Sequence, residues 1–89
     1  MLEVSFTAQF KKDYKLCKKR GYNLQLLKDI IDTLSIPESL PEKNRDHALT
    51  GNYVHKRECH IQPDWLLIYR IEENRLILYR MGTHTDLFK

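Results

Sequence analysis

The histidines of this chain stand where an acid–base site would need them. There are four: His60 and His84 lie at the ends of predicted strands, His47 lies in a loop just ahead of the strands, and His55 lies in the middle of a strand. Imidazole titrates near neutral pH, so two histidines can take a proton from a nucleophile and deliver one to a leaving group. We therefore take His47, His60 and His84 as the main candidates for chemistry and expect no role for His55.

Two further side chains are expected beside these histidines. Asp64 follows His60 across a short turn, and Arg80 lies close to His84 on the last predicted strand. A carboxylate can orient a histidine or act as a base, and a guanidinium stabilises charge that develops on a phosphoryl group. The set suits metal-independent RNA cleavage, in which a 2′-hydroxyl attacks the adjacent phosphodiester. The alternatives are a metal site built from His47, His60, His84 and Asp64, and histidines with structural roles alone.

Three neighbouring residues each have two interpretations. Trp65 would stack on a nucleobase or, as the first residue of a buried strand, belong to the core. Phe88 would hold the C-terminal tail in the core or serve as a platform for a base. Glu58 would join the proton chemistry or pair with a cation across neighbouring strands. Spacing along the chain leaves these roles open.

The elements that would position these residues begin with a short strand and two helices. Residues 2–6 alternate apolar and polar side chains, as in a half-buried strand. Thr7 and Asn23 are suitable N-caps, and Gly21 is a suitable stop between two helices. Each helix has one apolar stripe, formed by Phe10, Tyr14 and Cys17 in the first and by Leu24, Leu27, Ile31 and Leu34 in the second. We expect an antiparallel helical hairpin.

Strands follow the helices. Pro37 and Pro41 enclose a polar stretch that cannot continue the second helix. Strands are then predicted at residues 53–61, 65–71 and 75–81, and the middle one is apolar enough to be buried on both faces. With the first strand added, the order is β-α-α-β-β-β. The sequence thus predicts an α+β fold in which a helical hairpin packs on one face of a small antiparallel sheet.

Length and composition restrict the class of protein. The chain has 89 residues, 42 % of them hydrophobic, which suits a single domain over residues 1–89. No apolar run approaches the ~18 to 20 residues of a membrane span, and the N-terminus lacks a signal-peptide pattern. We therefore expect a cytoplasmic protein that does not bind membranes. Cys17 and Cys59 are too few for a disulfide framework and are expected to be reduced core thiols.

Positive charge is concentrated near the N-terminus. The chain has 15 Lys and Arg against 12 Asp and Glu, and Lys11, Lys12 and Lys15 belong to a basic cluster on the first predicted helix. Such a face attracts polyanions, either nucleic acid or an acidic protein, and it also keeps a small protein soluble. Composition alone does not choose among these.

The segments that carry these candidates resemble the YafQ branch of the RelE/ParE toxin superfamily. They are Asp46–Gly51, Arg57–Tyr69 and Gly82–Phe88, and the resemblance extends over essentially the whole chain. It implies a RelE/ParE-like fold and the toxin of a type II toxin–antitoxin system. Such a toxin is a ribosome-dependent endoribonuclease that cleaves mRNA in the A site by metal-independent attack of the 2′-hydroxyl, without a cofactor, and so inhibits translation. The family's active-site positions fall on His47, His60, Asp64, Arg80, His84 and Phe88.

The resemblance also implies partners. A DinJ- or RelB-like antitoxin would neutralise the toxin, and only the toxin–antitoxin complex would bind operator DNA. The ribosome and its mRNA would be the targets, with Lys11, Lys12 and Lys15 held on ribosomal RNA. Two alternatives keep the fold and drop catalysis: a ParE-like toxin that acts by binding gyrase, and an inactive co-repressor. Their histidines would be dispensable.

Overall fold

The computed structural model describes residues 1–36 and 38–88. Pro37, which was expected to help end the helical region, lies outside the described residues. The chain forms β1 (Glu3–Phe6), α1 (Ala8–Lys19) and α2 (Leu24–Ser35), then the 3₁₀ turn η1 (Glu42–Asn44), the short strand β2 (His47–Ala48) and the 3₁₀ turn η2 (Gly51–Tyr53). The strands β3 (Arg57–Gln62), β4 (Trp65–Glu72) and β5 (Arg75–Gly82) and the helix α3 (His84–Leu87) complete it.

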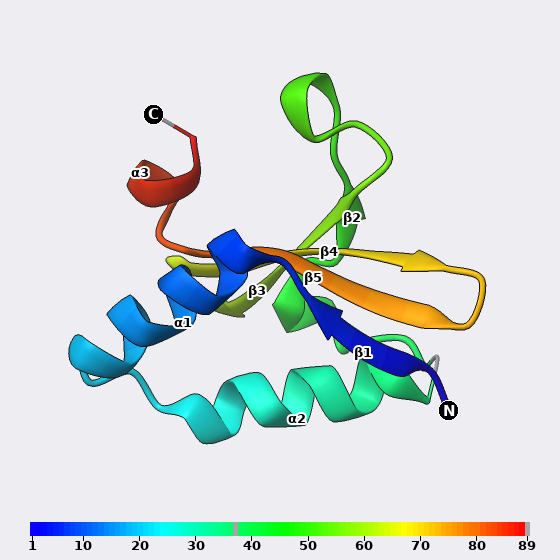
Figure 1. Ribbon diagram of the computed structural model, residues 1–89, viewed down its shortest axis with the longest axis horizontal. Helices are drawn as coiled ribbons and strands as arrows, with labels where there is room; N and C mark the ends of the chain where they lie inside the picture. Colours follow the sequence, from blue (N-terminus) through cyan, green and yellow to red (C-terminus); the bar gives the residue numbers. More distant parts are fainter. Residues whose placement is uncertain (37, 89) are drawn as a thin grey trace.

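The two long helices begin and end where the sequence indicates. Thr7 accepts a hydrogen bond from the backbone N–H of Phe10, and Asn23 accepts one from Gln25, so both expected N-caps are confirmed. Gly21 has a φ of 81°, which a residue without a side chain adopts readily. From this turn the helices diverge (Figure 1) and leave a groove of about 810 Å³. Its lining combines apolar side chains with Lys11, Lys15, Lys18 and Lys28.

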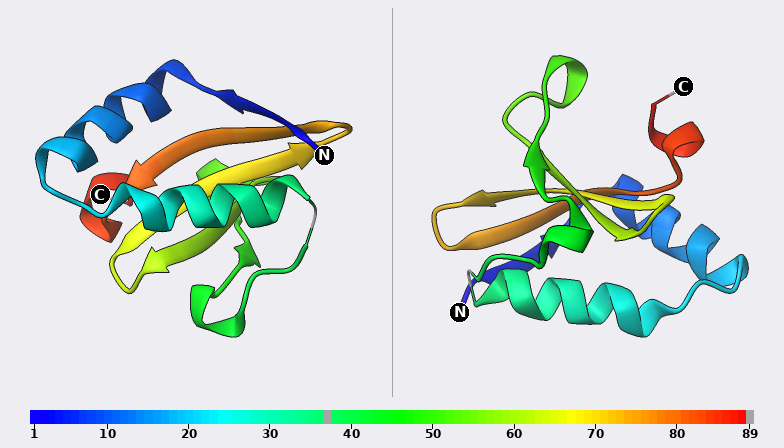
Figure 2. Two further views of the ribbon diagram at one scale, coloured as in Figure 1. Left: turned by 90° about the horizontal axis from the view of Figure 1, so that it is seen from below. Right: turned by 180° about the vertical axis from the view of Figure 1, so that it is seen from behind.

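The five strands form one mixed sheet in the order β1-β5-β4-β3-β2. The strands β3, β4 and β5 pair antiparallel, as predicted. The strand β2, which was not predicted, pairs antiparallel with β3, whereas β1 runs parallel to β5. In the sequence, α1 and α2 come between β1 and the other strands. In space, both helices cover one face of the sheet (Figure 2). The α+β class is confirmed. The prediction of an antiparallel sheet was wrong for β1, because a short alternating strand does not record which way its neighbour runs.

The expected strand over residues 53–61 begins later than predicted. A turn follows η2, His55 has a φ of 70°, and β3 starts only at Arg57. The position of His55 within a strand was therefore wrong, since a left-handed backbone conformation interrupts a β-strand. The intervening loop returns the chain so that β2 pairs with β3, with His47 opposite Glu58. His47 thus lies on the sheet edge rather than in a free loop.

Apolar side chains fill both faces of the sheet. On the helical face the core includes Phe10, Cys17, Leu27, Leu34, Trp65 and Tyr69. On the opposite face Leu66 and Ile68 pack with Leu87 of α3 and with Leu49, Tyr53 and Tyr79. The prediction that the strand from Trp65 is buried on both faces is confirmed, and Cys17 and Cys59 are buried free thiols as expected. The face opposite α1 and α2 carries the polar side chains described next.

Within residues 1–36 and 38–88, no helix has the length and apolar character that crossing a membrane requires.

Candidate active site

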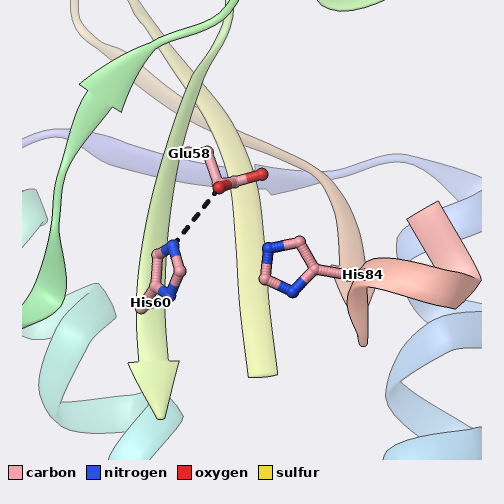
Figure 3. Close-up of side chains that lie close together, drawn as sticks. All are labelled: Glu58, His60 and His84. Atoms are coloured by element: carbon pink, nitrogen blue, oxygen red, sulfur yellow. Dashed lines mark ion pairs between the residues drawn. The ribbon is translucent and has the colours of Figure 1, made fainter. Parts of the chain in front are cut away.

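Strand register brings the candidate residues together. Glu58 pairs with Ile68 and Ile68 with Arg80, so one row across β3, β4 and β5 carries both charged groups. In the next row His60 pairs with Leu66, which pairs with Gly82. Because α3 begins just after Gly82, the chain returns over β4 and brings His84 towards His60. Figure 3 shows the two rings facing one another with Glu58 beside them.

Glu58 lies at the centre of the histidine cluster. It is buried, with 4 % of its surface exposed, and one carboxylate oxygen, Oε1, lies 3.5 Å from Nε2 of His47 and 3.5 Å from Nε2 of His60. The other oxygen, Oε2, is buried without a hydrogen-bond partner among the described residues. A buried carboxylate requires a nearby proton or cation. Oε1 of Glu58 is placed where it can pair with a protonated Nε2 of His47 or of His60.

The Nδ1 atoms of His47 and His60 face backbone carbonyl oxygens. Nδ1 of His47 lies 2.6 Å from the oxygen of Arg45, and Nδ1 of His60 lies 3.2 Å from that of Pro63. A carbonyl oxygen only accepts hydrogen bonds, so we assign the proton of each neutral ring to Nδ1. Both Nε2 atoms are thereby left to exchange protons next to Glu58.

Asp64 holds the third imidazole. One of its oxygens, Oδ1, accepts hydrogen bonds from the backbone N–H of His84 at 3.0 Å and from Nδ1 of the same residue at 2.8 Å. The backbone bond and then the ring bond hold the pKa of the Asp64 carboxyl below its usual value. The carboxylate stays charged and orients the ring, which leaves Nε2 of His84 free. The ring centroids of His60 and His84 are 5.7 Å apart.

An aromatic platform adjoins His84. The ring of Phe88 lies 6.3 Å from that of His84 and packs edge-on against Tyr53 at 5.6 Å. Phe88 remains 43 % exposed, so it does not plug the core. The hydroxyl of Tyr53 donates a 3.3 Å hydrogen bond to the carbonyl of Leu87. The geometry fits the alternative interpretation, a surface on which a base can stack.

The side chain of Arg80 is held in place by Asp13 of α1. Its Nε and Nη2 donate to the two carboxylate oxygens of Asp13 at 3.0 and 3.2 Å, and Asp13 also accepts from the backbone N–H of Met81. The hydrogen bond to Asp13 raises the pKa of Arg80, whereas burial acts to lower it. Tyr53 makes a smaller contribution that also raises this pKa. The guanidinium is thus fixed and permanently charged.

Two groups of predicted substrate contacts lie apart from this cluster. Trp65 is 2 % exposed and packs edge-on against Tyr22 in the helical-face core, so its proposed stacking on a nucleobase was wrong. Alternation along β4 explains this, because Leu66 faces the histidines and Trp65 points the other way. Lys11, Lys12 and Lys15 are exposed on α1. Lys11 and Lys15 border the groove between the long helices.

Three of these side chains have donor atoms suitable for a metal ion. One ligand atom each from Glu58, His60 and His84 lies within 4.8 Å of the others. The set differs from the four residues that the sequence suggested: it lacks both His47 and Asp64 and includes Glu58. Asp64 instead bonds to Nδ1, on the far side of the His84 ring. Two imidazole nitrogens and one carboxylate oxygen suit zinc or copper.

Glu58 lies closer to the histidines than the sequence indicated. The sequence left open whether Glu58 joins the proton chemistry or pairs with a cation across strands, and the structure places it among three imidazoles. Its spacing of two residues from His60 was the available signal, because alternate residues of a regular strand share a face. Its alignment with His47 across β2 and β3 could not be found without knowing that β2 exists.

Known proteins resemble this chain in both fold and sequence. The profile of the family described as "Bacterial toxin of type II toxin-antitoxin system, YafQ" matches residues 2–89. The mRNA interferase toxin YafQ of Escherichia coli strain K12 is 38 % identical over 88 residues, 97 % of this chain and 95 % of that protein. A copper-bound mutant toxin from Helicobacter pylori superposes with a TM-score of 0.95 at 39 % identity, covering 99 % of this chain and 100 % of the other.

A partner is present in a further match. A chain in the crystal structure of the E. coli DinJ-YafQ toxin-antitoxin complex has a TM-score of 0.90 at 35 % identity, over 99 % of this chain and 98 % of the other. These matches place the chain among bacterial toxins of type II toxin–antitoxin systems. Within that class, the chain is a member of the YafQ family. The expected family is confirmed.

Proposed function

We propose that residues 1–89 form one toxin domain that cleaves mRNA, with His60 and His84 as its acid–base pair. The single observation that carries this proposal is the placement of two imidazoles from different elements, β3 and α3, each fixed through Nδ1, with their centroids 5.7 Å apart beside a buried carboxylate. The curated E. coli relative is named an mRNA interferase toxin, which supports the same substrate.

The reaction needs two proton transfers and no external nucleophile. One imidazole removes the proton of the 2′-hydroxyl, whose oxygen attacks the adjacent phosphorus. The other donates a proton to the departing 5′-oxygen as its bond to phosphorus breaks, giving a 2′,3′-cyclic phosphate and a 5′-hydroxyl. Oε1 of Glu58 lies 3.5 Å from Nε2 of His60, where it can pair with that atom when it carries a proton. Asp64 orients His84 throughout.

The remaining side chains act on the phosphate and the base. Arg80 lies in the same sheet row as Glu58, and its fixed charge would stabilise the phosphoryl oxygens in the transition state. His47 shares Oε1 of Glu58 with His60 and would keep the shared proton within the cluster. Phe88 would stack on the base beside the scissile bond, where its exposed ring is available.

The wider setting follows from the family. We infer that cleavage occurs in the ribosomal A site in the cytoplasm, where Lys11, Lys12 and Lys15 bind ribosomal RNA through counterion release. We infer that an antitoxin comparable to DinJ neutralises the toxin and that operator DNA is bound only by their complex. The solved DinJ-YafQ complex supports the antitoxin partner.

A metal ion would inhibit rather than assist this chemistry. Glu58, His60 and His84 fit zinc or copper, and the similar H. pylori toxin was crystallised with copper. An ion there would occupy the same Nε2 atoms that must exchange protons. The reaction proposed above gives every proton transfer to an imidazole and needs no metal.

Inducible expression in bacteria tests the function directly. Wild-type protein should arrest translation and create new 5′ ends inside translated codons, mapped by primer extension. His84→Ala, with folding confirmed by circular dichroism, should abolish both effects. Arrest that survives His84→Ala with intact mRNA would overturn the proposal and favour a binding toxin that acts on gyrase, detectable as blocked supercoiling.

A substrate with an altered leaving group identifies which histidine is the general acid. In a substrate whose 5′-bridging oxygen is replaced by sulfur, departure no longer needs a proton. Whichever of His60→Ala and His84→Ala regains activity on this substrate has lost the general acid. Failure of the thio substrate to rescue either variant would contradict an imidazole acid.

A further inference from the structure

The helix that carries His84 is too short to hold its own position. It has four residues, His84–Leu87, and isolated helices of that length do not form in water. Its place depends on tethers: the Thr83 capping box, the Asp64 carboxylate and the Tyr53 hydroxyl are three of them. A fourth comes from α1 and involves none of the groups assigned to RNA or to proton transfer.

This fourth tether joins Arg20 to Asp86. Nη1 and Nη2 of Arg20 donate to the two carboxylate oxygens of Asp86 at 2.8 and 3.4 Å, across a sequence separation of 66 residues. Asp86 simultaneously accepts from the backbone N–H of Thr83 at 3.0 Å. The Arg20 bond and then the Thr83 bond hold the pKa of Asp86 far below its usual range. One carboxylate therefore connects the N-terminus of α3 to α1.

Because Gly82 has no side chain, the carboxylate of Asp86 can occupy the space beside it. A Cβ added at Gly82 would lie 2.8 Å from Oδ2 of Asp86, closer than real contacts allow. The Asp86 carboxylate thus lies against the backbone of the last β5 residue. Its position next to this residue ties the orientation of α3 to the end of β5.

Arg20 is itself well anchored. It is the C-cap of α1, and its backbone N–H donates to the carbonyl of Leu16. Asp13, which binds Arg80, lies seven residues earlier and so faces the same side of the helix. One side of α1 thereby holds two elements of the active site, Arg80 on β5 and α3 with His84.

Stability is a poor explanation for the Arg20–Asp86 pair. The two side chains are 35 % and 24 % exposed, and exposed ion pairs contribute little to folding. Catalytic groups, in contrast, must be held to within about 0.5 Å, and a displacement of about 1 Å can reduce the rate roughly 10²-fold. A tether on a four-residue helix is suited to the second purpose.

We propose that Arg20 is a positioning residue for RNA cleavage, which acts through Asp86 to fix α3 and thereby the imidazole of His84. The proposal rests on the proposed function, in which His84 transfers a proton. Arg20 contacts neither the imidazoles nor the RNA in this role. Its loss should lower the rate of the chemical step and leave RNA affinity and folding nearly unchanged.

The test compares Arg20→Ala, Arg20→Lys and Lys28→Ala in the full chain. Lys28→Ala is the matched control, because it removes an exposed ion pair of 2.7 Å, with Asp32, from α2. Single-turnover cleavage should fall roughly 10- to 100-fold in Arg20→Ala, with KM changed less than about threefold. Arg20→Lys should restore most of the rate because it returns the charge, and Lys28→Ala should cleave like the wild type.

A second measurement does not depend on cleavage. In ¹H–¹⁵N spectra, the Nδ1 proton of His84 should give a sharp, strongly downfield signal while it is bonded to Asp64. Arg20→Ala should broaden or shift it, and Lys28→Ala should not. If wild-type protein cleaves no RNA, the proposed function fails while this signal still reports on Arg20.

Three results would overturn the positioning role. Wild-type kcat in Arg20→Ala together with an unchanged His84 signal would show that α3 needs no tether from α1. A rise in KM alone, with kcat preserved, would make Arg20 an RNA contact. A fall in melting temperature that accounts for the whole loss of rate would make it a purely structural residue.

Discussion

Asp64 binds His84 twice through one oxygen, at 3.0 Å to the backbone N–H and at 2.8 Å to Nδ1 of the ring. The two bonds fix both the start of α3 and the tautomer of the imidazole it carries. Asp64 comes from the turn between β3 and β4, so a single carboxylate joins the sheet to the C-terminal helix. This relationship supports the proposed role of Asp64 as an orienting group, since a carboxylate with a lowered pKa is a weak proton acceptor.

Asp64→Asn should reduce kcat roughly 10²-fold or more, because the amide no longer selects the Nδ1–H tautomer. Single-turnover cleavage measures this, with Asp32→Asn on α2 as a control for the charge. The sign of the pH effect follows from the lowered pKa. The contribution of Asp64 to stability is present above about pH 4, its unfolded value, and is lost as pH falls through the lower folded value. A loss of activity in Asp64→Asn that appears only below about pH 4 would contradict the orienting role.

Glu58→Gln should lower kcat by about 10²-fold without unfolding the protein, because the amide keeps the shape but no longer favours a proton on Nε2 of His47 or His60. Histidine ¹⁵N spectra at neutral pH check the cause: the wild type should show more protonated Nε2 than the variant. Identical spectra for the two proteins would remove Glu58 from the proton chemistry.

Zinc or copper should inhibit cleavage, and removal of metal with EDTA should leave the activity of purified protein unchanged. The inhibitory ion would bind Glu58, His60 and His84, so Glu58→Gln should weaken metal binding by roughly 10-fold or more. Calorimetric titration measures this affinity, with His55→Ala as the control, since His55 is exposed in a turn away from the three ligands. Loss of activity on EDTA treatment, restored by zinc, would overturn the metal-independent mechanism.

Replacing Lys11, Lys12 and Lys15 together with glutamine should weaken ribosome binding and make it less dependent on salt. Each phosphate contact contributes about 0.7 to 0.9 to the slope of log K against log salt, so the slope should fall by about 2. The control is the double variant Lys28→Gln and Lys43→Gln, compared per charge removed. An equal fall per charge in both variants would show that net charge, rather than this face of α1, directs binding.

Trp65→Ala should destabilise the protein by about 3 to 5 kcal/mol, because it empties a fully buried site against Tyr22. Urea unfolding measures the change. Trp65→Phe should retain much of the stability and nearly all of the RNA affinity, whereas Phe88→Ala should retain stability and lose cleavage. Strongly reduced RNA affinity in a folded Trp65→Phe protein would restore Trp65 to the substrate site.

Much of this protein was determined by local sequence alone. The N-caps Thr7 and Asn23 and the turn at Gly21 specify α1 and α2, and the apolar run from Trp65 specifies a strand buried on both faces. These features follow from nearby residues, because capping, helical periodicity and burial act within a few positions of the chain. The histidines and Asp64 were also identifiable, since their types and their places at strand ends are local properties.

Tertiary structure decided the rest. Contacts between distant segments make β1 run parallel to β5 and make β2 bring His47 opposite Glu58. Such contacts also join Arg20 to α3 and Asp13 to β5. The pairing of β2 with β3 and the return of α3 over the sheet place Glu58 among three imidazoles, and alternation along β4 turns Trp65 away from them. The physical reason is that these hydrogen bonds and ion pairs join residues that are far apart in the sequence. Only packing of the folded chain brings such residues together.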